Sequence, residues 1–357
     1  MRGVLVLALG LGLAAQAQAS TVGRFSAKIE AEWPLSELQF VVERETPTTA
    51  LQLTFDCSYT NCSYWVDLSV NCGAYATAKS IAITAGSNTV DVDSVVQGAD
   101  ALTTLELQII KVTETNTEGS VSGTMALSNV AGGKLIKNAA TCQKPKSHKL
   151  LVFGDSLTCG FGVLGSDPCP FSGETESARL AWAGLTADSL NVDVNIVAWS
   201  GKGMVRNYGE KTSTSAMPLP AYYNSTLGSR VGQEGNYWEP SNYSPDLVIV
   251  YLGANDYSTN PHPTDDEFIG GYLAFVDRIR KDYPAAKLLL LTDNFSASDN
   301  GALKVANVQK VAQQTGAAFF RIPDSVVVLP HGCVGHPNQA QQRNMAAAVS
   351  PVVASLL

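Results

Sequence analysis

A short apolar run at residues 150–153, Leu-Leu-Val-Phe, is followed at once by Gly154, Asp155 and Ser156. A run without polar alternation is typical of a strand buried on both faces, as in a parallel sheet. Open α/β sheets bind their ligands just beyond the carboxyl ends of such strands, so Ser156 stands where a ligand would lie. Gly-Asp-Ser is also ordinary turn chemistry, and these residues alone fit a plain turn equally well. The rest of the chain favours the first interpretation.

Strands and helices alternate through the remainder of this half of the chain. Further strands are expected at residues 192–198, 246–252, 287–291 and 317–322, and helices at 174–190, 267–281, 302–315 and 345–357. This alternation predicts an α/β domain over residues 149–357, a parallel sheet in three α/β/α layers. Right-handed crossovers then bring the carboxyl ends of the strands to one edge of the sheet.

Residues 20–142 are predicted to be all-β. Apolar and polar residues alternate at 51–55, 65–70 and 105–109, which is the period of a half-buried strand. Clusters of Gly, Ser, Asn and Thr at 86–88 and 116–119 separate the runs, and no helical period interrupts them. Several short strands at this spacing predict a β-sandwich or jelly roll, joined to the second domain by a polar linker at 143–148. We expect this half to have an accessory role, in packing or in sugar contact.

The start of the chain predicts export. Residues 1–19 combine a short basic start, an apolar core and a small-x-small cleavage site, Ala17-Gln18-Ala19, as in a secretory signal peptide. That core is too short to span a bilayer, and no later stretch approaches about 18 uninterrupted apolar residues. The apolar run at 345–357 lacks the polar spacer of a lipid-anchor signal. We therefore expect a secreted, extracellular monomer with no membrane partner.

Charge and cysteine content narrow the possible partners. The net charge is −8 and no basic patch is present, which argues against nucleic acid. Seven cysteines in an exported chain predict disulfides, and proximity favours Cys57 with Cys62 and Cys159 with Cys169. No cysteine or histidine cluster has zinc spacing, so neither a metal nor a cofactor is expected. Four sequons would carry glycans in a eukaryotic host, at Asn61, Asn224, Asn242 and Asn294.

The edge of the predicted sheet collects the groups that acyl transfer needs, namely a nucleophile, a base and donors for the oxyanion. Ser156 offers a hydroxyl and its own N–H. Gly201 and Asn255 each follow another predicted strand, where the backbone N–H of the first and the amide of the second can donate. Taken alone, each fits a turn or a loop cap. Asp155 and Asp256 are expected to cap local backbone and shape the loops.

Of the four histidines, His336 has the best position for a base. It follows the last predicted strand and precedes Pro337 and the closing helix, so it can return to the same edge. His148 belongs to the linker and His262 to a proline-rich loop, while His331 is the rival.

Four blocks of this sequence resemble those of the SGNH (GDSL) hydrolases in the same order: residues 154–158, Gly201, residues 253–256 and His336-Pro337. Further stretches resemble carbohydrate esterase family two, at 159–162, 175–176, 200–203, 206–208, 245–248 and, in the first half, at 111–114 with Gly119. The first-half match is similar to the N-terminal jelly roll of that family, so the resemblance covers nearly the whole mature chain. It implies deacetylation of plant cell-wall polysaccharides such as xylan or glucomannan, with Ser156 as nucleophile and His336 as base.

The sequence departs from the family pattern at the acid of the triad. Most SGNH enzymes have an aspartate three residues before the histidine, and some members of family two have one two residues before it. Here Cys333 and Val334 occupy those positions. The resemblance then implies a serine–histidine dyad in which a backbone carbonyl, from residues 333–335, orients the imidazole.

Two interpretations from other classes remain. A GDSL-type lipase or phospholipase would share the catalytic residues and favour long acyl chains. A secreted, non-catalytic carbohydrate-binding protein could keep the fold and bind an acetylated sugar without hydrolysis.

Overall fold

The computed structural model describes the chain except residues 1–3, 8–16, 27–29, 58–59, 72–79, 116–122, 137–145, 297–299 and 329. It forms two compact units, Met1–Lys146 with Thr226–Arg230, and Ser147–Ser225 with Val231–Leu357. The predicted signal peptide lies partly outside the described residues, and its described stretches are backbone strands in the first unit. Residues 143–145 of the predicted linker also lie outside them.

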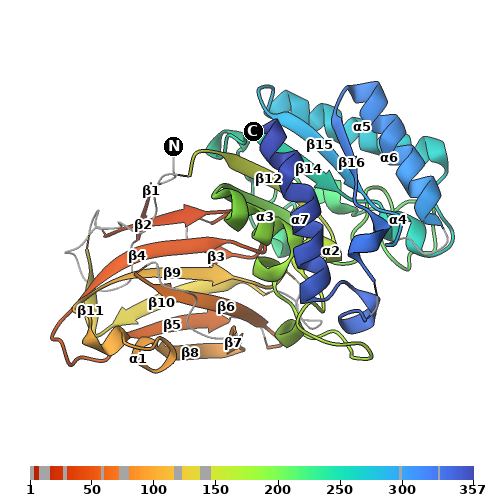
Figure 1. Ribbon diagram of the computed structural model, residues 1–357. Coiled ribbons are helices and arrows are strands. Elements are labelled where there is room, and N and C mark those ends of the chain that lie inside the picture. Colours follow the sequence, from red (N-terminus) through yellow and green to blue (C-terminus); the bar gives the residue numbers. More distant parts are fainter. Residues whose placement is uncertain are drawn as a thin grey trace. The chain divides into compact units, whose positions relative to one another are not determined.

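The first unit consists of two antiparallel sheets (Figure 1). The larger sheet has the order β1-β2-β4-β9-β6-β7 with β11 beside β4, and the smaller has the order β3-β10-β5-β8. The strands are β1 (Val4–Leu7), β2 (Ala17–Val22), β3 (Glu30–Ala31), β4 (Glu37–Arg44), β5 (Gln52–Cys57), β6 (Ser63–Val70), β7 (Ile81–Thr84), β8 (Gly86–Asp91), β9 (Thr104–Lys111), β10 (Met125–Ala131) and β11 (Gly133–Ile136).

The period-two pattern of the sequence places its apolar residues in the core of this unit. Leu38, Phe40 and Val42 of β4 are all buried in one apolar cluster. Phe40 and Val42 stand opposite Leu107 and Leu105 of β9, which belong to the same cluster. Cross-strand apolar pairs of this kind stabilise a sheet. The predicted all-β domain is confirmed.

Two details of the first unit differ from the sequence prediction. Residues 86–88 are not a turn: they begin β8, where Asn88 pairs with Phe55 and Gly86 with Cys57 of β5. The bend between β7 and β8 lies instead at Ala85. Pairing with β5 outweighs the turn propensity of Gly, Ser and Asn at residues 86–88. A short helix, α1 (Val92–Val95), also interrupts the strands, with Asp91 as its N-cap. The other predicted turn, residues 116–119, lies outside the described residues.

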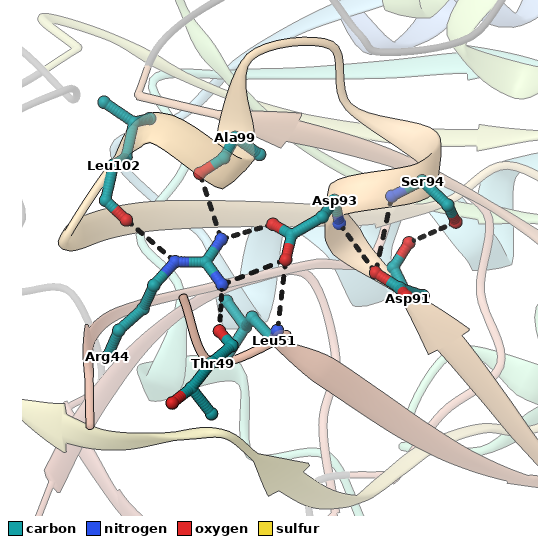
Figure 2. Close-up of polar contacts among 8 residues, drawn as sticks. All are labelled: Arg44, Thr49, Leu51, Asp91, Asp93, Ser94, Ala99 and Leu102. Carbon is teal, nitrogen blue, oxygen red and sulfur yellow. Dashed lines mark hydrogen bonds and ion pairs between the residues drawn. The ribbon is translucent and has the colours of Figure 1, made fainter. Parts of the chain in front are cut away.

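A buried arginine holds the loops at one end of this unit together (Figure 2). The Arg44 guanidinium pairs with the Asp93 carboxylate, which also accepts a hydrogen bond from the Leu51 N–H. Arg44 donates further to the carbonyls of Ala99 at 3.0 Å and Leu102 at 2.7 Å. All its partners lie in this unit, so this ion pair fixes the sandwich loops.

The second unit is built on a five-stranded sheet of order β13-β12-β14-β15-β16, and every neighbouring pair is parallel. Its strands are β12 (Lys149–Gly154), β13 (Asp193–Ala198), β14 (Leu247–Tyr251), β15 (Lys287–Thr292) and β16 (Ala318–Arg321). Strand β12, which lies between β13 and β14, is buried on both faces, as its unbroken apolar run predicts.

Helices cover both faces of this sheet, α3 and α7 on one and α5 and α6 on the other (Figure 1). The helices are α2 (Ser156–Cys159), α3 (Trp182–Leu190), α4 (Ala254–Ser258), α5 (Asp265–Asp282), α6 (Gly301–Thr315) and α7 (Gln339–Leu356). Helix α5 begins with a capping box, in which Thr264 Oγ1 accepts from the Glu267 N–H and Glu267 accepts from the Thr264 N–H. The predicted three-layer α/β/α architecture is confirmed. Among the described helices, none has both the length and the apolar character needed to cross a membrane.

The helix predicted at residues 174–190 is shorter than expected, because α3 starts only at Trp182. Before it, the chain forms two 3-10 turns, Gly173–Thr175 and Ala178–Leu180. The Ser177 N–H bonds to the Gly160 carbonyl at 3.2 Å, and the Trp182 N–H is capped by the Gln342 side chain at 2.8 Å. These tertiary bonds replace the helical ones that the apolar spacing suggests.

The disulfides agree with one predicted pair and contradict the other. Cys57 is bonded to Cys62, as proximity suggests. Cys169, however, is bonded to Cys333 and not to Cys159. Cys333 reaches Cys169 because its loop docks on the loop at Gly162, where the Cys333 N–H donates to the Gly162 carbonyl at 3.1 Å.

One segment from the second half of the sequence belongs to the first unit. Thr226–Arg230 packs there because Glu32, which is fully buried, accepts from the Ser229 N–H at 2.7 Å. Arg230 pairs with Glu30 at 3.0 Å. The sequence boundaries assign this segment to the hydrolase domain.

Candidate active site

Ser156 begins helix α2 directly after β12, at the carboxyl edge of the sheet. Asp155 caps that helix, since its Oδ1 accepts from the Leu157 N–H at 3.1 Å. The Ser156 side chain lines a cavity of about 370 Å³. Cavities at this edge are typical ligand sites of α/β domains.

His336 reaches Ser156 from the far end of the chain. The distance between His336 Nε2 and Ser156 Oγ is 2.9 Å, and that between His336 Nδ1 and the Val334 carbonyl oxygen is 3.1 Å. A carbonyl can only accept, so the hydrogen resides on Nδ1. The Nε2 lone pair then faces the serine hydroxyl, which is the arrangement of a general base.

The loop that presents His336 is held by several contacts. The Gly332 N–H donates to the His336 carbonyl at 2.7 Å, and the disulfide of Cys333 ties the loop to Cys169. Phe161 lies against the imidazole, with ring centroids 4.3 Å apart. Val334 adopts φ of 54°, in the left-handed region that β-branched residues rarely enter. That strained conformation belongs to the residue whose carbonyl orients the imidazole.

The environment of His336 favours its neutral form. Burial lowers the pKa of His336, and the nearby His331 lowers it further, while the carbonyls of Val334 and Cys333 oppose the shift. A neutral imidazole at neutral pH can take a proton from the serine.

Asn255 stands in helix α4, beyond the end of β14, and lines the same cavity. Its amide nitrogen donates to the Lys202 carbonyl at 2.8 Å and makes only a longer contact, 3.4 Å, with the Asp155 carboxylate. Gly201 has φ of 78°, which favours glycine, and open space lies where a side chain would be. Gly201, Asp155 and Asp256 are not among the described residues that line the cavity.

The two aspartates anchor the surrounding backbone. Asp256 accepts from the N–H groups of Met204, Val205 and Arg206, each at 2.8 Å, and so fixes the loop after β13. Burial raises the pKa of Asp256, and these three donors oppose the rise. Burial also raises the pKa of Asp155 to about 7, with the Leu157 N–H and the Lys304 charge acting against it.

Sequence reasoning did not identify several residues around this site. The Cys169–Cys333 bond and the left-handed backbone of Val334 act on His336, but no local pattern marks them. Phe161 lies in a stretch that resembles family two, but its contact with the imidazole was not predicted. His331, the rival base of the sequence analysis, lines the cavity, and its Nδ1 lies 3.1 Å from the Gln341 side-chain nitrogen.

Residues 152–348 match the model of the GDSL-like lipase/acylhydrolase family, which is more than half of the chain. The chain belongs to this family. The predicted resemblance is confirmed at that level.

This chain is similar to curated proteins whose names describe esterases. It is 30% identical over 213 residues to an acetylxylan esterase / glucomannan deacetylase of Cellvibrio japonicus, covering 59% of this chain and 57% of the relative. It is 32% identical over 157 residues to the cellulase/esterase CelE of Acetivibrio thermocellus, covering 44% of this chain and 18% of the relative. The matches thus span less than two thirds of the length of these relatives.

Solved structures share the whole fold. A family two carbohydrate esterase from Clostridium thermocellum, an active-site mutant in complex with a cello-oligosaccharide, superposes with a TM-score of 0.79 at 23% identity, covering 95% of this chain and 98% of that one. A family two carbohydrate esterase from Cellvibrio japonicus gives 0.75 at 22%, covering 95% of each chain. The family member therefore has the two-domain architecture of these esterases.

Proposed function

We propose that this protein is a secreted carbohydrate esterase that removes O-acetyl groups from plant cell-wall polysaccharide of the xylan or glucomannan type. The observation that carries the proposal is the contact of 2.9 Å between Ser156 Oγ and His336 Nε2. The names of the relatives support the polysaccharide substrate, and the family supports ester hydrolysis. The predicted signal peptide supports export.

The reaction proceeds through an acyl-enzyme. As Ser156 Oγ attacks the acetyl carbonyl, His336 Nε2 takes the hydroxyl proton. His336 then returns that proton to the sugar oxygen as the ester C–O bond breaks. Water repeats both steps on the acetyl-serine, releasing acetate. We propose that this reaction needs neither metal nor cofactor, and that the protein acts as a monomer without a nucleic-acid or membrane partner.

The oxyanion requires donors near Ser156. We assign this role to the N–H groups of Ser156 and Gly201 and to the Asn255 amide, whose long contact with Asp155 can yield to a substrate oxygen. A donor of this type lowers the barrier by about 3–4 kcal/mol. The Val334 carbonyl replaces the missing carboxylate of a triad: it fixes the imidazole orientation without contributing a full charge.

Acetate release from acetylated xylan and acetylated glucomannan, compared with fatty acid release from a triacylglycerol, tests this proposal. We expect acetate from at least one polysaccharide and no hydrolysis of the lipid. Preferred hydrolysis of long-chain lipid would replace the proposal with the lipase interpretation. Binding of acetylated polysaccharide without acetate release would favour the non-catalytic one.

A further inference from the structure

A buried ion pair lies behind one wall of the cavity and belongs to none of the motifs described above. Lys304 of α6 and Asp293, just after β15, are 2.9 Å apart between Nζ and Oδ2, and their side chains are 1% and 0% exposed. Burying two charges costs several kcal/mol per ion unless the geometry compensates, so such a pair is a poor stabilising device by itself. Its contacts indicate another role.

Asp293 anchors Ser296, which forms one wall of the cavity together with Phe295. Its carboxylate accepts from the Ser296 N–H at 2.6 Å and from the Ser296 hydroxyl at 2.7 Å. Lys304 also donates to that hydroxyl, at 2.5 Å, and Tyr251 donates to the carboxylate at 2.8 Å. Ser296 and its neighbour Phe295 line the cavity. Although burial opposes ionisation of Asp293, Lys304 and these hydroxyl donors hold its pKa below the usual range.

The same lysine contacts a second part of the cavity lining, helix α4, by its aliphatic stem. Gly253 has φ of 122° and precedes helix α4, and a Cβ there would lie 3.2 Å from Lys304 Cγ. The stem therefore packs against the backbone that begins α4, whose residues Ala254 and Asn255 line the cavity. The Lys304 side chain thus contacts the start of helix α4 with its methylenes, and Ser296 of the Phe295–Ser296 wall with its ammonium group.

We infer that the acyl group of the substrate lies between the Phe295–Ser296 wall and helix α4, and that Lys304 is a positioning residue that sets the width of this part of the cavity by fixing the wall against the helix. This inference rests on the proposed esterase function and assigns part of its acyl-chain selectivity. A rigid wall excludes added methylenes, and each methylene that a relaxed wall admits is worth about fourfold in kcat/KM.

The ion pair of the first unit provides a contrast. Arg44 and Asp93 are tied to loop backbone of the β-sandwich alone (Figure 2). Removing that pair should lower the melting temperature and leave the selectivity for acyl length unchanged. Removing Lys304 should alter selectivity as well, and selectivity is the readout that a purely structural role does not move.

The test uses the variants Lys304→Met and Lys304→Met/Asp293→Asn. Methionine keeps most of the stem volume, and the double variant avoids a buried carboxylate without its cation. Lys310→Met is the matched control, because it makes the same substitution at an exposed position of the same helix. For each protein, kcat/KM is measured with acetyl and butyryl esters of one aryl alcohol.

We expect the acetyl-over-butyryl preference to fall about tenfold in the double variant and to stay at the wild-type value in Lys310→Met. A folded double variant with an unchanged preference overturns the inference. If the wild type hydrolyses no ester, the proposed function fails. Crystal structures of the same variants then decide the positioning role, which is overturned if Phe295 and Ser296 keep their places.

Discussion

The protonation of Asp155 should make the stability of this protein depend on pH in a way that one substitution removes. Asp155 is fully buried beneath Ser156 and its pKa is raised to about 7 by burial. In the unfolded chain the pKa of an aspartate is about 3.9. A raised pKa in the folded state means that the fold prefers the protonated carboxyl. Stability is therefore complete below about pH 4 and is lost as the pH rises towards about 7.

The magnitude follows from the size of that shift. Between about pH 5 and about pH 8, ionisation of Asp155 should reduce the free energy of unfolding by about 2.5 kcal/mol. Asp155→Asn keeps an oxygen to accept from the Leu157 N–H and cannot ionise, so it should lose this dependence.

Urea unfolding of the wild type and of Asp155→Asn across this pH range provides the assay. The difference between the two unfolding free energies isolates Asp155 from the other titrating groups. We expect the variant to gain about 2.5 kcal/mol relative to the wild type between the two ends of the range. A constant difference would show that Asp155 does not change protonation in this range.

Three further predictions concern the reaction. Because burial lowers the pKa of His336, the acid limb of kcat/KM for an aryl acetate should have its midpoint below about pH 6.5, and a midpoint above about pH 7 would contradict the assigned base. Asp324→Asn should retain wild-type kcat, since Asp324 forms an exposed pair with Arg321 that is worth less than about 1 kcal/mol; a large loss of kcat in the folded variant would identify a missed acid. An acetyl ester should be strongly preferred to an octanoyl ester, and equal kcat/KM values would support the lipase interpretation.

Local patterns were sufficient to predict the frame that positions the site. The unbroken apolar run of β12 and the strand and helix alternation after it predicted the parallel sheet and its carboxyl edge. The capping residues Thr264 and Glu267 mark the start of a helix with clear apolar period, so α5 differs from its prediction by only a residue or two at each end. In such segments local propensity and tertiary packing agree.

Features that depend on distant contacts escaped prediction. Cys169 bonds to Cys333 because two loops dock at Gly162, and no spacing rule encodes that encounter. Helix α3 begins late because Gln342, from the other end of the domain, caps Trp182. A hydrogen bond between residues distant in sequence likewise holds Ser229 in the first unit, where its N–H donates to Glu32. The left-handed Val334 is strained locally, and its conformation depends on the surrounding loop contacts.

The most direct test of the account is kcat/KM for an aryl acetate in Ser156→Ala and His336→Ala, with Ser258→Ala as the matched control. Ser258 lines the same cavity, but its hydroxyl bonds to the Ala254 carbonyl of its own helix. We expect both dyad variants to fold and to lose at least about a thousandfold in kcat/KM, and Ser258→Ala to stay within about threefold of the wild type. Wild-type turnover in folded Ser156→Ala would show that Ser156 is not the nucleophile.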